Sequence, residues 1–426
     1  MNNIDYRYLR PKKAASLKTM YNCGFTFRDN LEVWRGQNAT ILPLREIPGD
    51  EMLFGRGGVV DANGDYVPLS ALGQNIRMSY PVSDPEFKDE TVVFCGYLVK
   101  HWGHFLVEAI TRLWYSLEQD ATADKYVFFL KEGEEREITG NYKEFFQLLG
   151  VWDKLEIISR PTRYREVIVP EMSFLKLSYY SQQHLNMLDA VANNITVDPS
   201  WKPLEKIFFT RSNFAKDNGY EFGLDFIDHF YEKNGYAVLA PEILPLSQTI
   251  YYIRNASEIA SISGSTPHNM LFARTGQGLT MVERLVMNDD FQISINLIRQ
   301  LDVTHLDANF HLYSVDWCGP YILGCNHILE QYIRDKGMSM PDDYYTSEKY
   351  RDLCIKQYMR SYQDNYRYRW FMEDWYPTIS DTIWEAYQDT YPYFQDYLDG
   401  KKPFLREHYY QWHYIKQFIK RLIRRS

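Results

Sequence analysis

The stretch of sequence that decides the fold covers residues 256–285 and reads ASEIASISGSTPHNMLFARTGQGLTMVERL. Its pattern predicts a short apolar strand over 258–262, a turn of small residues over 263–266, a helix that opens at Pro267, and a second strand over 279–285. A turn of serine and glycine before a helix leaves backbone N–H groups without partners, so it suits an anionic phosphate. The same residues would also make an ordinary connection between a strand and a helix, and this stretch alone does not decide between the two.

Strand and helix patterns alternate on the N-terminal side of this stretch. After an irregular first 90 residues, the alternation runs to about residue 193, passes a segment with two prolines at 196–204, and then restarts. Strands separated by helices predict a parallel sheet with crossover helices, so two such blocks predict an α/β protein with two Rossmann-like domains that face a cleft. The expected units are an N-terminal domain over 1–200, a C-terminal domain over 201–330, and an aromatic-rich helical region over 331–426 that packs back on the N-terminal domain.

Composition excludes several classes of protein. The formal net charge of −9 argues against a nucleic-acid binder. The 5 cysteines are odd in number and scattered, which favours a reducing compartment over a disulfide framework. The N-terminus has no apolar leader and no run reaches the length of a membrane span, so we expect a cytoplasmic protein.

The C-terminal residues 409–426 have the pattern of a basic amphipathic helix. Its apolar residues fall at helical spacing on one face, and basic residues occupy the rest. Such a helix can lie on an anionic bilayer, which would make the protein peripheral on the inner face of the plasma membrane. A helix that packs its apolar face on the protein would show the same pattern.

A candidate acid–base group lies at residues 100–114, which read KHWGHFLVEAITRLW. In a helix predicted over 104–119, His104, Glu108 and Arg112 step by four residues, and His101 precedes them by three, so all four can line one side. A histidine beside a carboxylate near the end of a parallel strand suits a general base with an orienting partner. A capping histidine plus a surface ion pair would explain any one of these residues.

A candidate anion-binding residue is Arg211, in the segment FFTRSN at 208–213. Arginine at the carboxyl end of a strand is a good bidentate partner for a diphosphate. The chain contains no Asp-x-Asp pair, the usual metal anchor for a nucleotide-sugar diphosphate. Phosphate charge would therefore be met by backbone N–H groups and cationic side chains, and we expect neither a metal nor a cofactor. No dinucleotide fingerprint, P-loop or nucleophile elbow is present in a suitable context.

Taken together, these stretches resemble glycosyltransferase family 61, which includes many bacterial capsule and surface-polysaccharide transferases. The resemblance spans about residues 91–285 and rests on HWGHFLVE with TRLW, FFTRS, ASEIASISG with HNMLFA, and the strand that carries Glu283. Many members have His-Gly-Ala-Gly-Leu-Thr-Asn where this chain has SGSTPHN at 263–269. The histidine of that turn is absent from its usual place, and His268 is the candidate to replace it.

The resemblance implies a GT-B architecture, with the acceptor mainly in the first domain and a nucleotide-sugar donor mainly in the second. It implies an inverting, metal-independent transfer to a growing glycan or a lipid-linked glycan. Glu108 or His104 would be the base, supported by His101 and Arg112, and Glu283 would bind the ribose. The donor phosphates would contact Arg211, Gly264, Ser265, Thr266, His268 and Asn269. The competing hypothesis is a non-catalytic glycan-binding or scaffold protein of a polysaccharide assembly complex.

Overall fold

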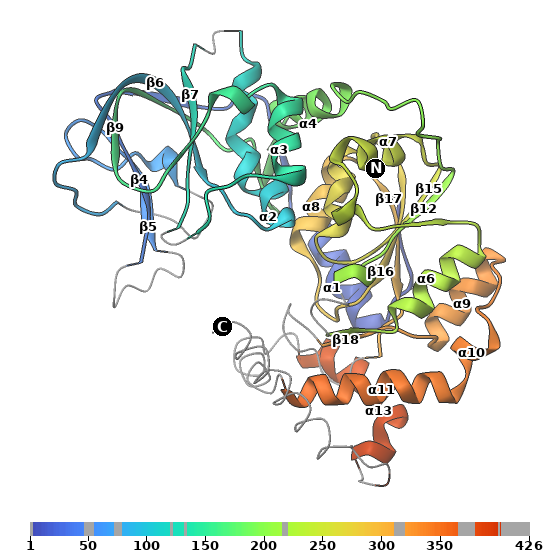
Figure 1. The fold of residues 1–426 in the computed structure, drawn as a ribbon. Helices are drawn as coiled ribbons and strands as arrows, with labels where there is room; N and C mark the ends of the chain where they lie inside the picture. The colour runs from blue at the N-terminus through green and yellow to red at the C-terminus, as the bar shows by residue number, and fades with distance from the viewer. Residues whose placement is uncertain are drawn as a thin grey trace, which may run out of the picture.

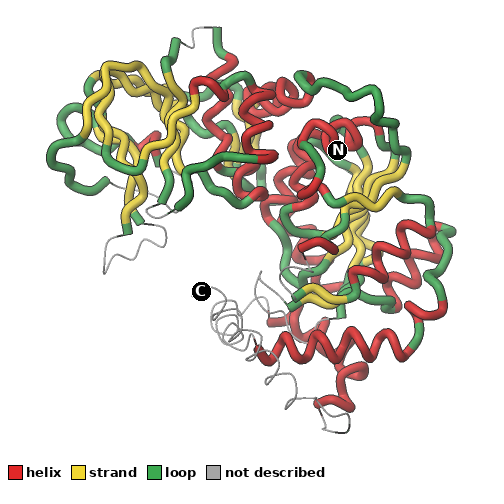
Figure 2. Tube along the Cα trace, viewed as in Figure 1, coloured by secondary structure: helices red, strands yellow, loops and turns green. Residues whose placement is uncertain are grey.

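Two sheets with a layer of helices between them form the core of the chain (Figures 1 and 2). The computed structural model describes residues 3–46, 55–71, 79–119, 122–131, 134–214, 220–310, 320–364, 380–398 and 401. The predicted α/β class is confirmed, because strands alternate with helices and most strand pairs in the two sheets are parallel. The pairing of two Rossmann-like domains across a cleft stays a prediction.

The sheet that carries the opening stretch has six strands, and its five strand pairs are all parallel. Its order is β1 (Ile4–Tyr8), β17 (Asp302–Asp307), β16 (Gly278–Glu283), β15 (Glu258–Ile262), β12 (Lys206–Phe209) and β14 (Ala237–Leu239). The N-terminal strand thus belongs to this second sheet, which corrects the predicted assignment of all residues before 200 to the other domain. The local pattern could not reveal this, because β1 pairs with β17, a strand distant from it in the sequence.

The first sheet is mixed. Its parallel part contains β9 (Thr162–Pro170), β6 (Glu86–Tyr97), β7 (Lys125–Phe129) and β8 (Leu155–Ile158). Antiparallel strands β3 (Val33–Gln37), β4 (Thr40–Arg45) and β5 (Arg56–Val60) extend it beyond β9. The N-terminal region that the sequence suggested to be irregular therefore supplies strands to both sheets.

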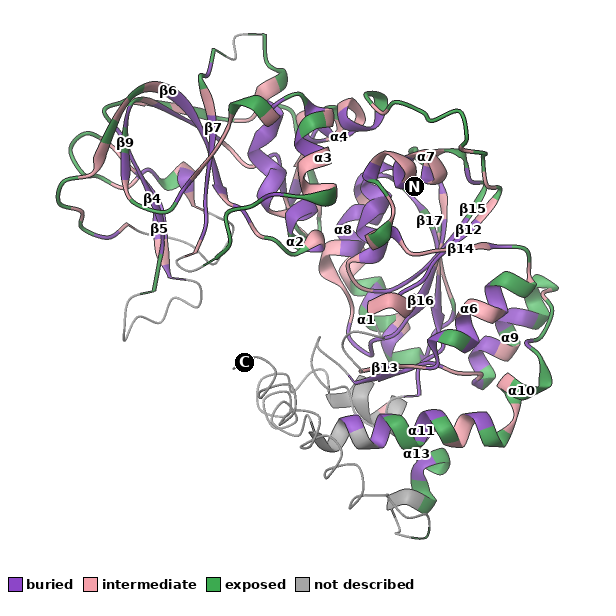
Figure 3. Ribbon diagram, viewed as in Figure 1, coloured by how far each residue is buried: buried purple, intermediate pink, exposed green. Residues whose placement is uncertain are grey.

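The helices between the sheets share one apolar core. From the first block come α2 (Trp102–Val107), η2 (Ala109–Leu117), α3 (Gly140–Leu149) and α4 (Gln182–Asn193), and from the second α7 (Leu246–Asn255), η5 (Thr266–Phe272) and α8 (Asp290–Ile298). A single cluster of buried residues runs through both sets (Figure 3). The ring centroids of Phe145 and Phe272 lie 6.5 Å apart across the boundary. The two blocks are therefore packed together through their helices.

The remaining helices lie around the second sheet, except two short 3₁₀ helices at 68–70 and 152–154, which lie in the first block. They are α6 (Leu224–Lys233), α9 (His327–Lys336), α10 (Asp343–Thr346), α11 (Glu348–Asp364), α13 (Ser380–Leu398), α1 (Pro11–Tyr21), η1 (Pro68–Ser70), η3 (Trp152–Lys154) and η4 (Pro241–Ile243). Two small sheets pair β10 (Phe174–Leu175), β11 (Tyr179–Ser181) and β2 (Thr26–Arg28), and β13 (Glu221–Phe222) with β18 (Tyr321–Ile322).

The C-terminal helices contact the second sheet and the N-terminal segment. Buried residues of α9 and α11 belong to the apolar cluster on the outer face of the second sheet, and Arg10 of the N-terminal segment pairs with Asp389 of α13. No helix in the described part of the chain has the length and apolar character to cross a bilayer. The predicted basic helix at 409–426 lies outside the described residues, so its contact with a membrane stays a prediction.

Candidate functional site

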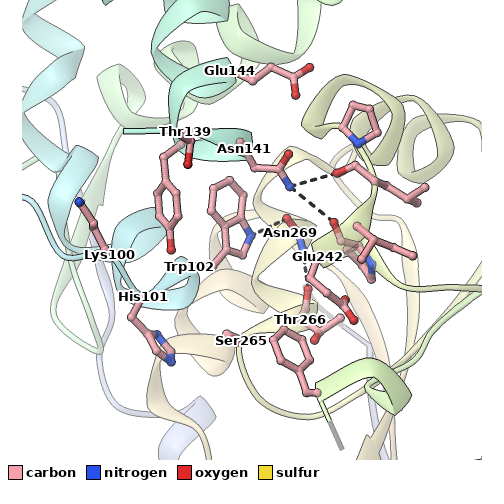
Figure 4. Close-up of a pocket in the computed structure, with 17 residues that line it drawn as sticks. Lys100, His101, Trp102, Thr139, Asn141, Glu144, Glu242, Ser265, Thr266 and Asn269 are labelled. Carbon is pink, nitrogen blue, oxygen red and sulfur yellow. Dashed lines mark hydrogen bonds between the residues drawn. The ribbon is translucent and has the colours of Figure 1, made fainter. Parts of the chain in front are cut away.

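A cavity of about 730 Å³ lies where the helical layer meets the carboxyl edge of the second sheet (Figure 4). One wall comes from the starts of α2 and α3, including His101, Trp102 and Asn141. The opposite wall comes from segments that follow β12, β14 and β15, and includes Glu242. In parallel α/β sheets this edge is where ligands bind.

Hydrogen bonds fasten the two walls to each other. Asn141 Nδ2 donates to the carbonyl oxygens of Leu244, at 3.1 Å, and Pro241, at 3.5 Å (Figure 4). The Glu144 carboxylate accepts from the backbone N–H groups of Leu246 and Ser247 at the start of α7. The Glu144 bonds satisfy free N–H donors at a helix start. Together with the Asn141 bonds they hold the segment between β14 and α7 against α3.

A second connection joins α2 to the turn that follows β15. Trp102 Nε1 donates to Asn269 Oδ1 at 3.0 Å, and Asn269 Nδ2 donates to the carbonyl oxygen of Thr266 at 2.8 Å. Gly103 allows this close approach, because a Cβ built on it would lie 2.8 Å from both Nδ1 of His268 and Cβ of Ser265. Ser265, Thr266 and Asn269 line the cavity, as expected for donor-binding residues, although no ligand tests that role.

Two arginines converge on the turn at Gly264. Gly264 has a φ of +123°, and a Cβ built there would lie 2.7 Å from Arg284 Nη2 and 3.3 Å from Arg211 Nη1. Glu221 accepts both the Nε and Nη2 hydrogens of Arg211, at 3.0 and 2.8 Å, and lies 3.3 Å from Arg284 Nη1. All three side chains are buried, and Glu221 is a partner of both arginines at the carboxyl edge of the sheet.

This arrangement changes the basis of the predicted anion site. The turn leads into η5, a 3₁₀ helix of only seven residues, and not into an α-helix that opens at Pro267. A helix this short has little dipole, so the positive character of the turn comes mainly from Arg211 and Arg284. Arg284 was missed from the sequence, although it follows Glu283 directly on the same strand end.

Glu283 lies in a buried ion-pair network. One carboxylate oxygen lies 3.2 Å from Lys13 Nζ, and the other lies 2.7 Å from His305 Nδ1. His305 Nε2 in turn lies 2.9 Å from the Tyr21 hydroxyl. Burial alone would raise the pKa of Glu283, but Lys13 and His305 hold it below its ordinary value. Both oxygens are thus engaged by protein groups, and these contacts fasten the N-terminal segment to the carboxyl end of β16. The ribose role suggested by the sequence stays a prediction.

His104 and Glu108 form the expected pair, with His104 Nδ1 2.7 Å from Glu108 Oε2. This hydrogen bond raises the pKa of His104 despite partial burial. Neither side chain lines the cavity; the histidine that does is His101, whose ring centroid lies 5.1 Å from that of His104. Burial, the neighbouring histidines and Arg211 lower the pKa of His101, which favours a neutral imidazole.

Arg112 lies apart from this pair. The helix predicted over 104–119 is divided into α2 and the 3₁₀ helix η2, so the four-residue spacing does not align Arg112 with Glu108. Arg112 is 1% exposed and donates to the carbonyl oxygens of Pro170, Leu69 and Ala71. Burial lowers its pKa to about 10. Arg112 therefore stabilises the first sheet and the loop beside it.

His268 lies behind the cavity wall. It is buried against Gly103, and its Nε2 is 3.4 Å from the carboxylate of Asp289. Asp289 caps α8 by accepting from the N–H groups of Phe291 and Gln292, and although burial opposes this, His268 and the capping bonds lower its pKa. His268 does not line the cavity, so a direct contact with donor phosphates stays a prediction.

Glu242 is a cavity residue that the sequence did not single out. It lies in η4, directly after β14, and burial raises its pKa although Asn213 and Arg211 act in the opposite direction. Neither of its carboxylate oxygens has a hydrogen-bond partner of normal geometry among the described residues. Its position after the carboxyl end of a strand was the available signal.

Comparison with protein families gives one result that agrees with this geometry. The model of the family described as Glycosyltransferase 61 matches residues 102–280, which supports the resemblance and indicates a glycosyltransferase. The match begins in α2, ends in β16 and includes nearly all of the cavity wall; His101, Glu283 and Arg284 lie just outside it. A comparison with curated proteins gave no match. No group of three or more histidine, cysteine or acidic side chains suited to a metal occurs among the residues that the structure describes.

Proposed function

We propose that the protein is an inverting, metal-independent glycosyltransferase that moves a sugar from a nucleotide-sugar donor to a capsule or other cell-surface glycan. The observation that carries this proposal is the convergence of Arg211 and Arg284 on Gly264, which directly precedes the cavity-lining residues Ser265 and Thr266. The two guanidinium groups, which both lie next to Glu221, place two cationic groups where a parallel sheet presents its carboxyl edge. The family match over 102–280 supports the same class of reaction.

In this proposal the donor diphosphate binds at the turn after β15. Ser265 and Thr266 offer hydroxyl groups to it, and Arg211 lies 3.5 Å from the Thr266 hydroxyl. The leaving phosphate gains negative charge during transfer, and fixed cationic donors in a partly dry site stabilise that charge without reorganisation. Positively charged side chains would thus supply the stabilisation for which other enzymes use a metal ion.

The acceptor hydroxyl would approach from the side of α2. Glu108 or His104 would take its proton as it attacks the anomeric carbon in line with the departing phosphate. His101 lies between this pair and the cavity, and its lowered pKa keeps its imidazole able to accept a proton. The division into donor side and acceptor side is that of a GT-B enzyme, which is the architecture we propose for the two blocks.

The experiment is a binding and transfer assay on purified protein with a panel of nucleoside diphosphates and nucleotide sugars. Arg211→Ala should weaken nucleotide binding by about ten- to a hundredfold, because a hydrogen bond to a charged group contributes about 1.5–3 kcal/mol. Arg211→Lys keeps the charge without the planar fork and should recover part of the affinity. Arg254→Ala removes an arginine that pairs with Asp189 away from the cavity, and it should bind nucleotides as the wild type does.

A substitution at Glu108, directly after α2, should affect sugar transfer and nucleotide binding differently. Glu108→Gln should abolish transfer to glycan acceptors while nucleotide binding persists, because Glu108 lies outside the donor wall. A wild-type protein that binds a nucleotide sugar but never transfers or hydrolyses it would instead support a non-catalytic glycan-binding or scaffold protein. A wild-type protein that binds no nucleotide would refute the proposal.

A further inference from the structure

A small sheet lies against the carboxyl edge of the second sheet. It consists of β13 and β18, which pair in parallel with Glu221 and Tyr321 as register partners. Figure 1 shows β18 next to α11, which packs against both strands. The backbone N–H of Phe310, shortly after β17, donates to the carbonyl oxygen of Ile322 at 2.9 Å. The small sheet is therefore fixed at the edge where the proposed donor binds.

The two arginines that converge on Gly264 contact both members of this register pair. The carboxylate of Glu221 accepts two hydrogen bonds from one edge of the Arg211 guanidinium group, from Nε and Nη2. It also lies 3.3 Å from Arg284 Nη1, and the guanidinium carbon of Arg284 lies 4.1 Å from the centroid of the Tyr321 ring. The nitrogens nearest to a Cβ built on Gly264 are different ones, Arg211 Nη1 and Arg284 Nη2. Glu221 thus contacts the sides of the two guanidinium groups that do not point at the turn.

The guanidinium group of Arg211 lies beside two residues that line the cavity. Its Nη1 is 3.5 Å from the Thr266 hydroxyl, and its carbon is 4.9 Å from the centroid of the Phe214 ring. A guanidinium group binds phosphate oxygens through N–H groups that lie in one plane, so its orientation matters as well as its charge. The direction in which Nη1 points therefore decides whether Arg211 can reach a ligand in the cavity.

The charge of Glu221 by itself opposes the binding of an anion. A carboxylate beside the arginines reduces the attraction that they exert on a phosphate. Burial and the nearby Arg211 lower the pKa of Arg284, whereas Tyr321 and Glu221 act in the opposite direction. The two arginines are thus close enough to repel each other, and their neighbours keep them together. Glu221 can favour anion binding only through the place and orientation that it imposes on the arginines.

We propose that Glu221 and Tyr321 are positioning residues that orient Arg211 and Arg284 toward the diphosphate of the donor. The inference rests on the proposed function, because that function supplies the ligand. Both residues are buried, and in this role they act through the arginines and not by touching the donor. Because two arginines can hold two phosphate groups, their misalignment should weaken the binding of diphosphates more than that of monophosphates.

The first test compares wild type with Glu221→Gln by calorimetry, using uridine and guanosine diphosphates and the corresponding monophosphates. A glutamine cannot accept the two parallel hydrogen bonds from Arg211, because one of its two terminal atoms is a donor. Diphosphate affinity should therefore fall about tenfold or more, with a smaller loss for monophosphates. Removal of a negative charge alone would instead tighten the binding of both ligands, and a purely structural role would lower the melting temperature without changing the affinity of the folded protein. Either of these results, or an equal loss with both ligands, would overturn the proposal.

A second pair of variants changes no charge and decides the question if Glu221→Gln does not fold. Tyr321→Leu removes the aromatic face beside Arg284 and should weaken diphosphate binding about two- to thirtyfold, the loss expected for a cation–π contact. Tyr321→Phe keeps the ring and should bind diphosphates as wild type does. If Tyr321→Leu also binds as wild type does, or if Tyr321→Phe loses as much affinity, the ring does not position Arg284 and the proposal fails.

A control variant and the wild-type result separate this inference from its premise. Glu330→Gln makes the same change in another carboxylate–arginine pair, with Arg334 on α9, where the Glu330 side chain is 46% exposed; it should alter no affinity. Wild type that binds diphosphates, together with variants that bind them equally well, refutes the inference alone. Wild type that binds none of the nucleotides refutes the proposed function, and the inference with it.

Discussion

Gly103 controls how closely the two blocks approach each other at the cavity. It lies in the first turn of α2 between Trp102, which bonds to Asn269, and His104. In Gly103→Ala the new Cβ would lie 2.8 Å from two different atoms, Nδ1 of His268 and Cβ of Ser265. Since ordinary contacts begin near 3.4 Å, α2 and the turn after β15 must part by several tenths of an ångström.

The expected loss of stability in Gly103→Ala follows from how little the neighbouring residues can move. His268 is buried beside Asp289, and Ser265 is part of the turn that carries the arginine site, so neither is a flexible side-chain end. Overpacking of this kind costs about 1–3 kcal/mol. The same displacement moves His101 relative to the donor wall, and a shift approaching 1 Å costs up to about a hundredfold in rate. We therefore expect lower stability and a larger proportional loss of transfer than of nucleotide binding.

The assay pairs urea unfolding with nucleotide binding and transfer. Gly278→Ala is the matched control, because a Cβ built on Gly278 meets nothing within 4 Å. It should change the free energy of unfolding by no more than about 0.5 kcal/mol. If Gly103→Ala unfolds at the same urea concentration as wild type and transfers at the same rate, the close contact between α2 and the turn does not exist.

Two further predictions concern charged pairs. Glu283→Gln should lower the free energy of unfolding by about 3–5 kcal/mol, since it leaves the buried Lys13 ammonium unpaired; the exposed Glu330→Gln should lower it by less than about 1 kcal/mol. Because the pKa of Glu283 is lowered by folding, its contribution is present above the unfolded pKa and is lost as pH falls through the folded one. Glu108→Gln should lower the pKa of His104, measured by NMR titration, since the Glu108 hydrogen bond is the main cause that raises it; an unchanged titration would contradict the pair.

The strands and helices of the two blocks were predictable because apolar runs lie between clear turn signals. The predicted strand at 258–262 coincides with β15. The placement of β1 was not predictable, because it depends on a parallel pair with β17 and on the Lys13 to Glu283 contact that follows it. Such pairs are formed between distant segments, and no local pattern records them.

The sequence predicts at which strand ends the site residues lie, but it does not predict the direction in which their side chains point. Residues just after β12 and β15 do lie at the carboxyl edge, and Arg211, Ser265 and Thr266 gather there. Glu283 occupies the corresponding end of β16, yet its side chain is paired with Lys13 and His305, which the sequence pattern could not foresee. Glu242 belongs to no motif, and its position after the carboxyl end of β14 was the one signal that the sequence offered.

The continuous core between the sheets bears on how a donor is bound. In proteins whose domains meet through small polar interfaces, relative motion is the ordinary expectation. Here buried residues of α2, α3, α7 and η5 form one cluster, and the hydrogen bond from Trp102 to Asn269 crosses the same boundary. Opening the two blocks would expose that apolar surface to water, so the cavity is held at nearly fixed dimensions. If the proposed donor binds there, its selection depends on polar groups that are already in place on the walls, among them Asn141, Thr266 and Asn269.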